Sequence, residues 1–467
     1  MQHDPVTRLL NRDGEPIEVE TINEFLGDLA GRAIQPRDAD YDTARRIWNG
    51  AIDRYPGLVV RCLGTADVIH AVRFARAKDL QVSVRGGGHN VAGRALCDGG
   101  MVIDLSWMRA VMVDPQTRVI EVQGGATLGD LDRETHLYGL AVPTGVVSKT
   151  GVAGLTLGGG VGWLVRKYGL SCDNVVSFEV VTAEGQLLTA SREENPDLFW
   201  ALRGGGGNFG IVTRFRFRAQ PIATVLGGMI VHPRERAGEV LRFYRDFMAQ
   251  APEDLTAYAG MVTSPDGVPV IAIICCWSGP MSEGERVLEP LRAFGPPLAD
   301  VVQPMPFPAM QQLLDPAFPD GSYNYWKASF VPRLTDEVAD LLVEHGNRIR
   351  SPMSAVVIEF YGGAPGRVGP SESAFAQRRA EYNIGIIAQW LDPAESAEHI
   401  QWARTFYDAL EPHSSGDHFL NFQSEMADEV VRRSFGENYS RLVEVKRKYD
   451  PTNFFSLNQN IRPAEAA

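Results

Sequence analysis

Residues 84–90 read Val84-Arg85-Gly86-Gly87-Gly88-His89-Asn90 and close a β-rich run at residues 81–85. Two more glycine clusters lie at residues 151–162 and 204–210, and glycine supplies 47 of the 467 residues, above a background of roughly 7%. Glycine lets the backbone approach a ligand and aim several N–H groups at an anion. A single cluster is ordinarily a tight turn, but three clusters together predict a site for a pyrophosphate.

The third cluster contains a formal GxGxxG pattern at Gly205, Gly207 and Gly210. In the dinucleotide-binding fold this pattern follows a strand and opens a helix. Here it follows a helical run at residues 197–203 and precedes a strand at 211–216, so we exclude nicotinamide dinucleotide binding there. The chain has no P-loop and no HExxH motif, and its nine histidines lack metal-ligand spacing. We therefore expect no metal site.

The length of 467 residues exceeds what one hydrophobic core usually serves, which predicts two lobes. Residues 56–218 alternate short β-rich runs with helical patterns, which indicates an α+β lobe. Residues 222–413 carry longer runs typical of an antiparallel sheet, at 270–277, 355–361 and 382–390.

Two features of this second region predict how its sheet is built. Ser264-Pro265-Asp266-Gly267 has the composition of a tight turn and predicts a hairpin into the run at 270–277. Apolar residues recur at helical spacing over 235–250 and 335–349. We expect these helices to cover one side of the sheet.

A final helix is predicted over residues 428–449, and Asp450-Pro451-Thr452-Asn453 stops it and starts an extended tail. We therefore divide the chain into residues 1–220, 221–415 and 416–467. The first segment should bind the cofactor, the second the substrate, and the third should return to the first lobe.

The formal net charge of −13 argues against a nucleic acid or an anionic membrane as partner. The amino-terminal residues show no basic segment followed by an apolar run, and no apolar stretch of about 18 residues occurs. Five cysteines without a CxxC pair indicate buried free thiols. These features predict a cytoplasmic protein, and they leave its oligomeric state open.

Four ordered motifs over nearly the whole chain resemble the FAD-linked oxidases related to berberine bridge enzyme, within the vanillyl-alcohol-oxidase and p-cresol-methylhydroxylase type of flavoprotein. They are residues 84–90, residues 143–174, residues 203–212 and the carboxyl-terminal residues 448–461. The resemblance implies a two-lobed FAD-binding fold with an inserted antiparallel-sheet substrate domain covered by helices. It also implies that His89 bonds to the 8α-methyl carbon of the flavin. A lone histidine is otherwise more often structural.

The resemblance assigns FAD contacts to further residues, by their positions in the four motifs. These are Arg85, Gly86, Gly87, Gly88, Asn90, Gly125, Thr144, Gly145, Thr150, Gly151, Gly154, Gly158, Gly159, Gly160, Gly162, Trp163, Asn174, Ile211, Val212 and Asn458.

The sequence departs from the family pattern at positions that matter for chemistry. Val147 stands where many relatives attach FAD a second time through cysteine, so attachment through His89 alone is implied. Val161 replaces a tyrosine, and Gly385 replaces the glutamate or glutamine of a late strand. The proton acceptor must therefore lie elsewhere.

Candidate catalytic residues by resemblance to bacterial relatives are Tyr325, Lys327 and Asn421. Asn383 lies two positions before Gly385 and shares its strand face, so it is placed to orient a substrate. Buried polar groups that pair with the backbone are the alternative interpretation.

The implied reaction takes hydride from a C–H bond of a small alcohol, sugar, amine or secondary metabolite and passes the electrons to dioxygen. Thr150 occupies the position that controls oxygen access in relatives, and its valine-like shape favours an oxidase. A dehydrogenase with another electron acceptor and a non-catalytic flavin-binding protein remain the alternatives.

Overall fold

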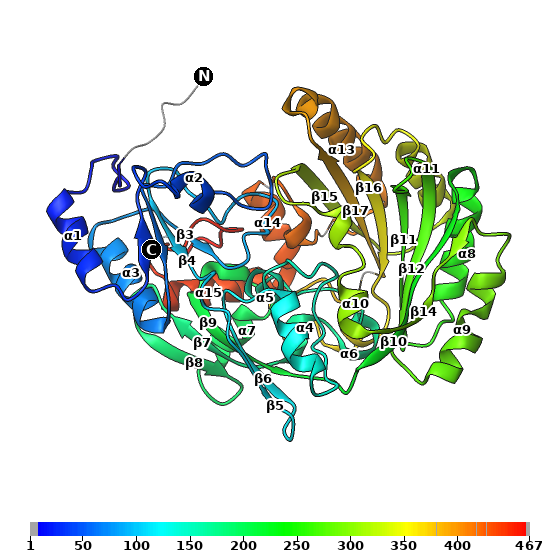
Figure 1. Ribbon diagram of the computed structural model, residues 1–467, viewed down its shortest axis with the longest axis horizontal. Coiled ribbons are helices and arrows are strands. Elements are labelled where there is room, and N and C mark those ends of the chain that lie inside the picture. Colours follow the sequence, from blue (N-terminus) through cyan, green and yellow to red (C-terminus); the bar gives the residue numbers. More distant parts are fainter. Residues whose placement is uncertain (1–7, 380, 417, 426, 464–467) are drawn as a thin grey trace.

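The computed structural model describes residues 8–379, 381–416, 418–425 and 427–463. They form two lobes with three β-sheets, and helices accompany both lobes (Figure 1). The blue to green elements up to β9, together with the red α15, make one lobe, and the green to orange elements from β10 to α13 make the other. The predicted α+β class is confirmed. No helix in the described part of the chain has the length and apolar character needed to cross a membrane.

A four-stranded sheet opens the first lobe, and three of its strands are parallel. The strands, in spatial order, are β1 (Arg32–Ile34), β2 (Leu58–Arg61), β4 (Met101–Asp104) and β3 (Val82–Arg85). Helix α3 (Thr65–Ala77) buries Val68, Ala71 and Val72 in the core beneath this sheet. Because β3 ends at Arg85, the first glycine cluster begins at the carboxyl end of a parallel strand, where such sheets bind ligands.

The second sheet of this lobe is antiparallel and five-stranded. In order it contains β5 (Val111–Asp114), β6 (Val119–Gln123), β9 (Ile211–Arg218), β7 (Val175–Val181) and β8 (Leu187–Ser191). Helix α7 (Pro196–Leu202) precedes the third glycine cluster, and β9 follows it directly. This helix–cluster–strand order is the one predicted, and it is the reverse of the dinucleotide fingerprint.

The eight-stranded sheet of the second lobe is antiparallel throughout. In order it contains β13 (Ala299–Asp300), β10 (Thr224–Pro233), β12 (Pro269–Trp277), β11 (Leu255–Thr263), β16 (Ala355–Phe360), β17 (Tyr382–Trp390) and β15 (Tyr323–Val331), and β14 (Gln303–Pro306) pairs with β10. The predicted hairpin is confirmed, because Ser264 and Val268 close the turn between β11 and β12 through a backbone hydrogen bond of 2.8 Å.

Four helices cover one face of this sheet, and the opposite face is turned toward the first lobe (Figure 1). They are α8 (Ala237–Met248), α9 (Met281–Ala293), α11 (Asp336–Gly346) and α13 (Ser396–Leu410). Ile358, Ile384 and Ile386 point into the core under these helices. Since side chains alternate along a strand, their neighbours Val357, Glu359 and the residues flanking Ile384 belong to the opposite face, which we call the open face.

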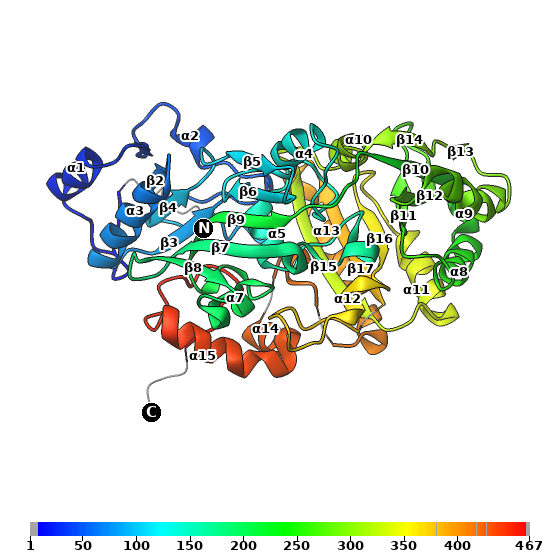
Figure 2. The ribbon, with the colours of Figure 1, turned by 90° about the horizontal axis from the view of Figure 1, so that it is seen from below.

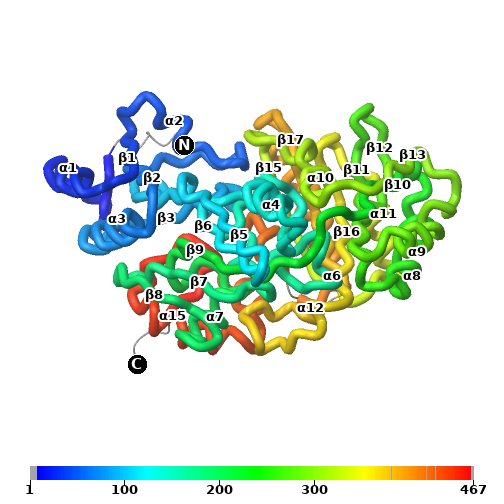
Figure 3. Tube along the Cα trace, turned by 60° about the horizontal axis from the view of Figure 1, so that its bottom comes forward, coloured from blue at the N-terminus to red at the C-terminus, as the bar shows by residue number. Residues whose placement is uncertain are grey.

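The predicted helix over 428–449 is two helices, α14 (Asp428–Phe435) and α15 (Tyr439–Tyr449). Gly436 separates them with φ +51°, a conformation that glycine adopts readily. Figures 2 and 3 show α15 and the red carboxyl-terminal trace against the first lobe, beside β7 and β8. Fully buried Lys446 secures this return, because its Nζ donates to the carbonyls of Asn208 and Phe455 and pairs with Asp450 at 2.6 Å.

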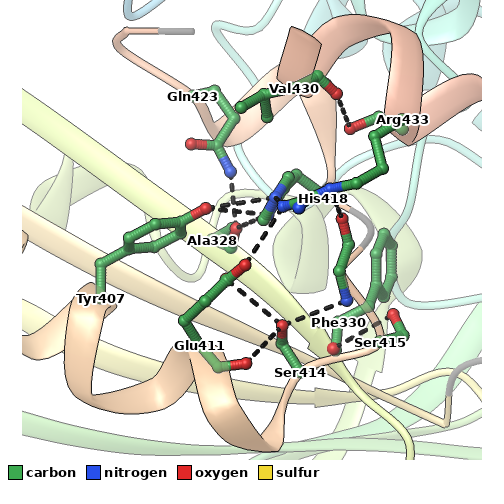
Figure 4. Close-up of polar contacts among 12 residues, drawn as sticks. Ala328, Phe330, Tyr407, Glu411, Ser414, Ser415, His418, Gln423, Val430 and Arg433 are labelled. Carbon is green, nitrogen blue, oxygen red and sulfur yellow. Dashed lines mark hydrogen bonds and ion pairs between the residues drawn. The ribbon is translucent and has the colours of Figure 1, made fainter. Parts of the chain in front are cut away.

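Polar contacts around His418 attach the start of the carboxyl-terminal segment to strand β15 (Figure 4). His418 is fully buried, with Nδ1 at 3.2 Å from the carbonyl of Ala328, and the Tyr407 hydroxyl lies 3.2 Å from each ring nitrogen. The Gln423 amide donates to the same Ala328 carbonyl at 2.6 Å. The chain therefore crosses from the second lobe to the first at a fixed place, next to the edge of the large sheet.

Candidate active site

A cavity of about 860 Å³ lies between the two lobes. Its lining includes glycines from all three clusters, residues 313, 314 and 316–318 of the segment before β15, and the open face of the large sheet. Ligand pockets in proteins occupy roughly 300–1,000 Å³. The cavity is therefore large enough for a dinucleotide-sized cofactor or a sizeable ligand, and the segments predicted to bind a pyrophosphate meet in it.

The glycines of the three clusters form the first-lobe wall of the cavity. They fall into two groups, according to which atoms an added Cβ would meet. At Gly87 a Cβ would lie 2.5 Å from the backbone nitrogen of Gly151, so two backbone segments touch here. At Gly154 and Gly207 it would meet nothing within 4 Å, and both residues line the cavity. The first group brings the walls together, and the second leaves space for a bound group. This bare backbone cradle fits FAD.

His89 lies on this wall, directly after the first cluster. Its ring stacks on Trp48 with centroids 4.2 Å apart and planes 13° apart. Its Nε2 is buried and has no hydrogen-bond partner among the described residues. Burial lowers the pKa of His89 to about 4, so the imidazole is neutral at neutral pH and keeps a free lone pair. A neutral, oriented, unpartnered imidazole is what nucleophilic attachment to a flavin requires.

Trp48 is a contact that the sequence did not reveal, because it lies 41 positions before His89 in no recognisable motif. Its Nε1 donates to the carbonyl of Phe318 at 3.1 Å, which joins it to the loop of the second lobe. The indole is thereby fixed between the lobes and sets the orientation of the His89 ring.

Arg85 lies behind the lining of this cavity, and its contact with FAD stays a prediction. Its guanidinium forms a buried ion pair with Asp104 and donates to the carbonyl of Ala44 at 2.6 Å. Arginine at this position therefore anchors the end of β3 and holds the following glycines in place.

The other predicted cofactor residues divide between the lining and the layer behind it. Those that line the cavity are Gly86, Gly87, Gly88, Asn90, Gly145, Thr150, Gly151, Gly154, Gly158, Ile211, Val212 and Asn458. Those outside the lining are Gly125, Thr144, Gly159, Gly160, Gly162, Trp163 and Asn174, and their contact with FAD stays a prediction.

The residues behind the lining hold it in shape. The Thr144 hydroxyl accepts a hydrogen bond from Gln311 at 3.0 Å, and the amide of Asn174 donates to the carbonyls of Tyr168 and Leu170. Trp163 packs against Tyr258, with ring centroids 5.3 Å apart. A motif match identifies such residues without telling which of them touch the ligand.

A polar cluster on the open face of the large sheet forms the other wall. Glu359 of β16 lines the cavity at 4% exposure, and its Oε2 accepts hydrogen bonds from the Tyr361 hydroxyl at 2.6 Å and from the Asn383 amide at 2.7 Å. Burial raises the pKa of Glu359, and the two donors act against that rise. Glu359 was missed, although a lone acid in the apolar strand Ala355–Phe360 was a signal that could have found it.

Asn383 and Gly385 share the open face, as the strand alternation predicted. Asn383 is fully buried behind Glu359 and outside the cavity lining, so it holds the carboxylate and does not itself reach a substrate. Its predicted direct role is corrected to a positioning role.

Tyr325 and Lys327 lie on the other face of the sheet, and their predicted catalytic roles are corrected. Trp326, between them, lines the cavity, so alternation turns both neighbours away from it. The Tyr325 hydroxyl donates to Glu425 at 2.9 Å and accepts from Arg404, and the Lys327 amine donates to the Glu425 carbonyl at 3.2 Å. These groups hold α13 and the carboxyl-terminal segment to the sheet.

Asn421 does line the cavity, at the point where a Cβ on Gly158 would lie 2.1 Å from its Oδ1. Its amide donates to the carbonyl of Leu155 at 3.2 Å. Thr150, Val147 and Val161 also line the cavity, so the wall next to the second glycine cluster presents apolar surface and a single hydroxyl.

This fold and this cavity define a flavin-dependent oxidoreductase. Residues 56–191 match the family described as FAD binding domain, and residues 418–462 match the berberine and berberine-like family. The chain belongs to the FAD-linked oxidoreductases related to berberine bridge enzyme.

Relatives match along almost the full length. An FAD-linked oxidoreductase of Dictyostelium discoideum is 31% identical over 96% of this chain and 98% of its own. (R)-6-Hydroxynicotine oxidase of Paenarthrobacter nicotinovorans is 32% identical over 93% of this chain and 97% of its own. The crystal structure of 6-hydroxy-D-nicotine oxidase from Arthrobacter nicotinovorans superimposes with a TM-score of 0.86 at 32% identity, covering 93% of this chain and 98% of that one. The two-lobed FAD-binding fold is thereby confirmed.

Proposed function

We propose that this protein is an FAD-dependent oxidase that carries its flavin covalently on His89 through the 8α-methyl carbon and oxidises a small organic substrate. The observation that carries the proposal is the state of His89: neutral, stacked on Trp48, with Nε2 unpartnered among the described residues and placed at the cavity wall. The named activity of the nicotine-oxidising relative supports an oxidase within this family.

Bound FAD would supply the acceptor for hydride and return the electrons to dioxygen. His89 and the first glycine cluster would hold one end of the flavin. The backbone at Gly154 and Gly207 would leave room for the rest of the cofactor, because no side chain projects from these positions. Arg85 keeps the first cluster in register through its ion pair with Asp104.

Val147 and Thr150 support two further parts of the proposal. Val147 lines the cavity and offers no thiol, which supports attachment through His89 alone. Thr150 presents a small side chain at the same wall, which is compatible with access of dioxygen to the reduced flavin.

The first test is acid precipitation of the purified protein. The wild-type pellet should stay yellow, and the pellet of His89→Ala should be colourless. His413→Ala is the matched control, because His413 lies outside the cavity lining and should leave the pellet yellow. A colourless wild-type pellet with a yellow supernatant would overturn covalent attachment.

The second test separates an oxidase from a dehydrogenase. After reduction by dithionite and removal of the excess, admission of air should reoxidise the flavin within seconds and yield peroxide. Slow reoxidation by air, together with fast reoxidation by an artificial dye, would identify a dehydrogenase.

A further inference from the structure

Glu359 is the only acidic residue among the described residues that line the cavity. Arg94 is the only lysine or arginine in that lining, and Glu359 forms no ion pair with any described residue. A buried carboxylate without a cationic partner is costly in free energy. A ligand that brings a positive charge to this position would offset that cost.

The two oxygens of the Glu359 carboxylate are in different situations. Oε2 accepts both hydrogen bonds, from Tyr361 and Asn383. Oε1 has no hydrogen-bond partner among the described residues, and Glu359 lines the cavity. Tyr361 and Asn383 therefore fix the carboxylate in a rotamer that presents one oxygen to a ligand.

The open face around Glu359 is largely apolar, and the hydroxyl of its cross-strand neighbour Tyr258 already donates to the carbonyl of Gly162. Val357 and Ile274 lie on the same open face, and Trp326 and Phe422 pack edge to face at 5.5 Å beside them. Farther along the open face the lining continues through Met229 and Ala272. A substrate that fits this surface has an apolar body and one polar group, which lies at Glu359.

We propose that the substrate is an apolar amine whose N–H is held by Oε1 of Glu359. This inference rests on the proposed FAD-dependent function. A sugar does not match this wall, because its many hydroxyls would lose their hydrogen bonds to water against Val357, Ile274 and Ala272. An uncharged alcohol would bring no positive charge to stabilise the ionised carboxylate.

The chemistry balances with groups that are named here. The protonated amine gives one N–H proton to Oε1 of Glu359, and the neutral amine then loses hydride from its adjacent carbon to FAD, which takes up two electrons. The substrate leaves as an iminium ion, which water converts into a carbonyl compound and a protonated amine. Dioxygen takes up the two electrons with the hydride hydrogen and the Glu359 proton, giving hydrogen peroxide. Burial raises the pKa of Glu359, which makes it a better proton acceptor.

Calorimetric titration of the purified holoprotein tests this inference without relying on turnover. The probes are amine and alcohol pairs that share one carbon skeleton: benzylamine and benzyl alcohol, 4-phenylbutylamine and 4-phenylbutanol, 1-aminoindane and 1-indanol. At least one amine should bind wild type about tenfold or more tightly than its alcohol. The reason is that a hydrogen bond to a charged group contributes more free energy than one between neutral groups. Glu359→Gln keeps the side-chain shape and should abolish this preference.

Glu425→Gln is the matched control, because Glu425 is a carboxylate on the far side of the sheet, paired with Arg404. It should keep the amine preference. No preference in any pair, or a preference that survives in Glu359→Gln, would overturn the inference. Acid precipitation of Glu359→Gln should still give a yellow pellet. A colourless wild-type pellet would refute covalent attachment of the flavin. The titration would still test amine binding by Glu359 on its own.

Discussion

The two walls of the cavity are built by different means. The first-lobe wall is largely backbone, because glycines from three clusters bring the main chain to the surface, and His89 lies on it with its Nε2 buried and unpartnered among the described residues. The second-lobe wall is made of side chains on one sheet face, with Glu359 among apolar neighbours. A backbone wall binds whatever shares the shape and charge of the cofactor. A side-chain wall can change its ligand by single substitutions, so we expect cofactor binding and substrate choice to be separable by mutation.

Glu359→Gln should give the largest effect on substrate oxidation without an effect on cofactor binding. Loss of the proton acceptor should lower kcat/KM for the best amine about 100-fold or more, the range found for general bases. Flavin content should equal that of wild type, because Glu359 belongs to the sheet wall. Steady-state oxygen consumption together with flavin absorbance measures both. Unchanged kcat/KM would show that the sheet wall contributes no proton acceptor.

Two alanine substitutions should distinguish the glycines that bring backbone segments together from those that leave space for the cofactor. Gly87→Ala places a Cβ 2.5 Å from the Gly151 nitrogen, so it should destabilise the fold by about 1–3 kcal/mol. Gly154→Ala lies within helix α5 (Val152–Leu157) and meets no atom within 4 Å. It should keep or raise the stability of flavin-free protein by up to about 1 kcal/mol and still reduce flavin incorporation. Urea unfolding and flavin-to-protein absorbance ratios test this pair, and equal behaviour of the two variants would contradict the division.

The pH dependence of the free energy of unfolding should show that the pKa of Glu359 is raised by burial. Its pKa is raised in the folded protein, so the native state binds more protons than the unfolded state above the ordinary value of 4.5. The free energy of unfolding of wild type should therefore fall relative to Glu359→Gln as the pH rises from 4.5, and the two should converge below it. The facing groups Tyr258 and Tyr361 have pKa values raised well above 10, so they do not titrate in this window. A gap that stays constant from pH 4 to pH 8 in urea titrations would contradict the raised pKa.

The smallest effects should come from the covered face of the same sheet. Tyr325→Phe and Lys327→Met remove contacts to Glu425 and no contact with the cavity. Each should change kcat/KM less than twofold, and stability by about 1 kcal/mol or less, the net value of a typical hydrogen bond. A tenfold loss of kcat/KM in either variant would return these residues to the active site.

Much of the first-lobe wall could be predicted from the sequence, because its signals are local. Clustered glycines and the histidine that follows them are neighbours in the chain, and the helix before Gly204 already excluded the dinucleotide fingerprint. The hairpin at Ser264 was equally local. The break at Gly436 was missed, because one glycine inside a helical pattern is tolerated and signals no stop by itself.

The second-lobe wall could not be predicted in the same way. A strand offers two faces, and the choice between Trp326 and its neighbours Tyr325 and Lys327 depends on which face the helices cover. That is decided by α13, some 70 residues farther along the chain. The pairing of Glu359 with Asn383 likewise depends on the register of β16 and β17. Trp48 reaches His89 only through tertiary packing.

The most direct test of the central claim is peptide mass mapping of the wild-type protein after digestion. We predict that the peptide containing His89 carries the mass of one flavin attached to the histidine, and that no other peptide carries it. An unmodified His89 peptide from yellow protein, or a flavin on any other residue, would contradict the account.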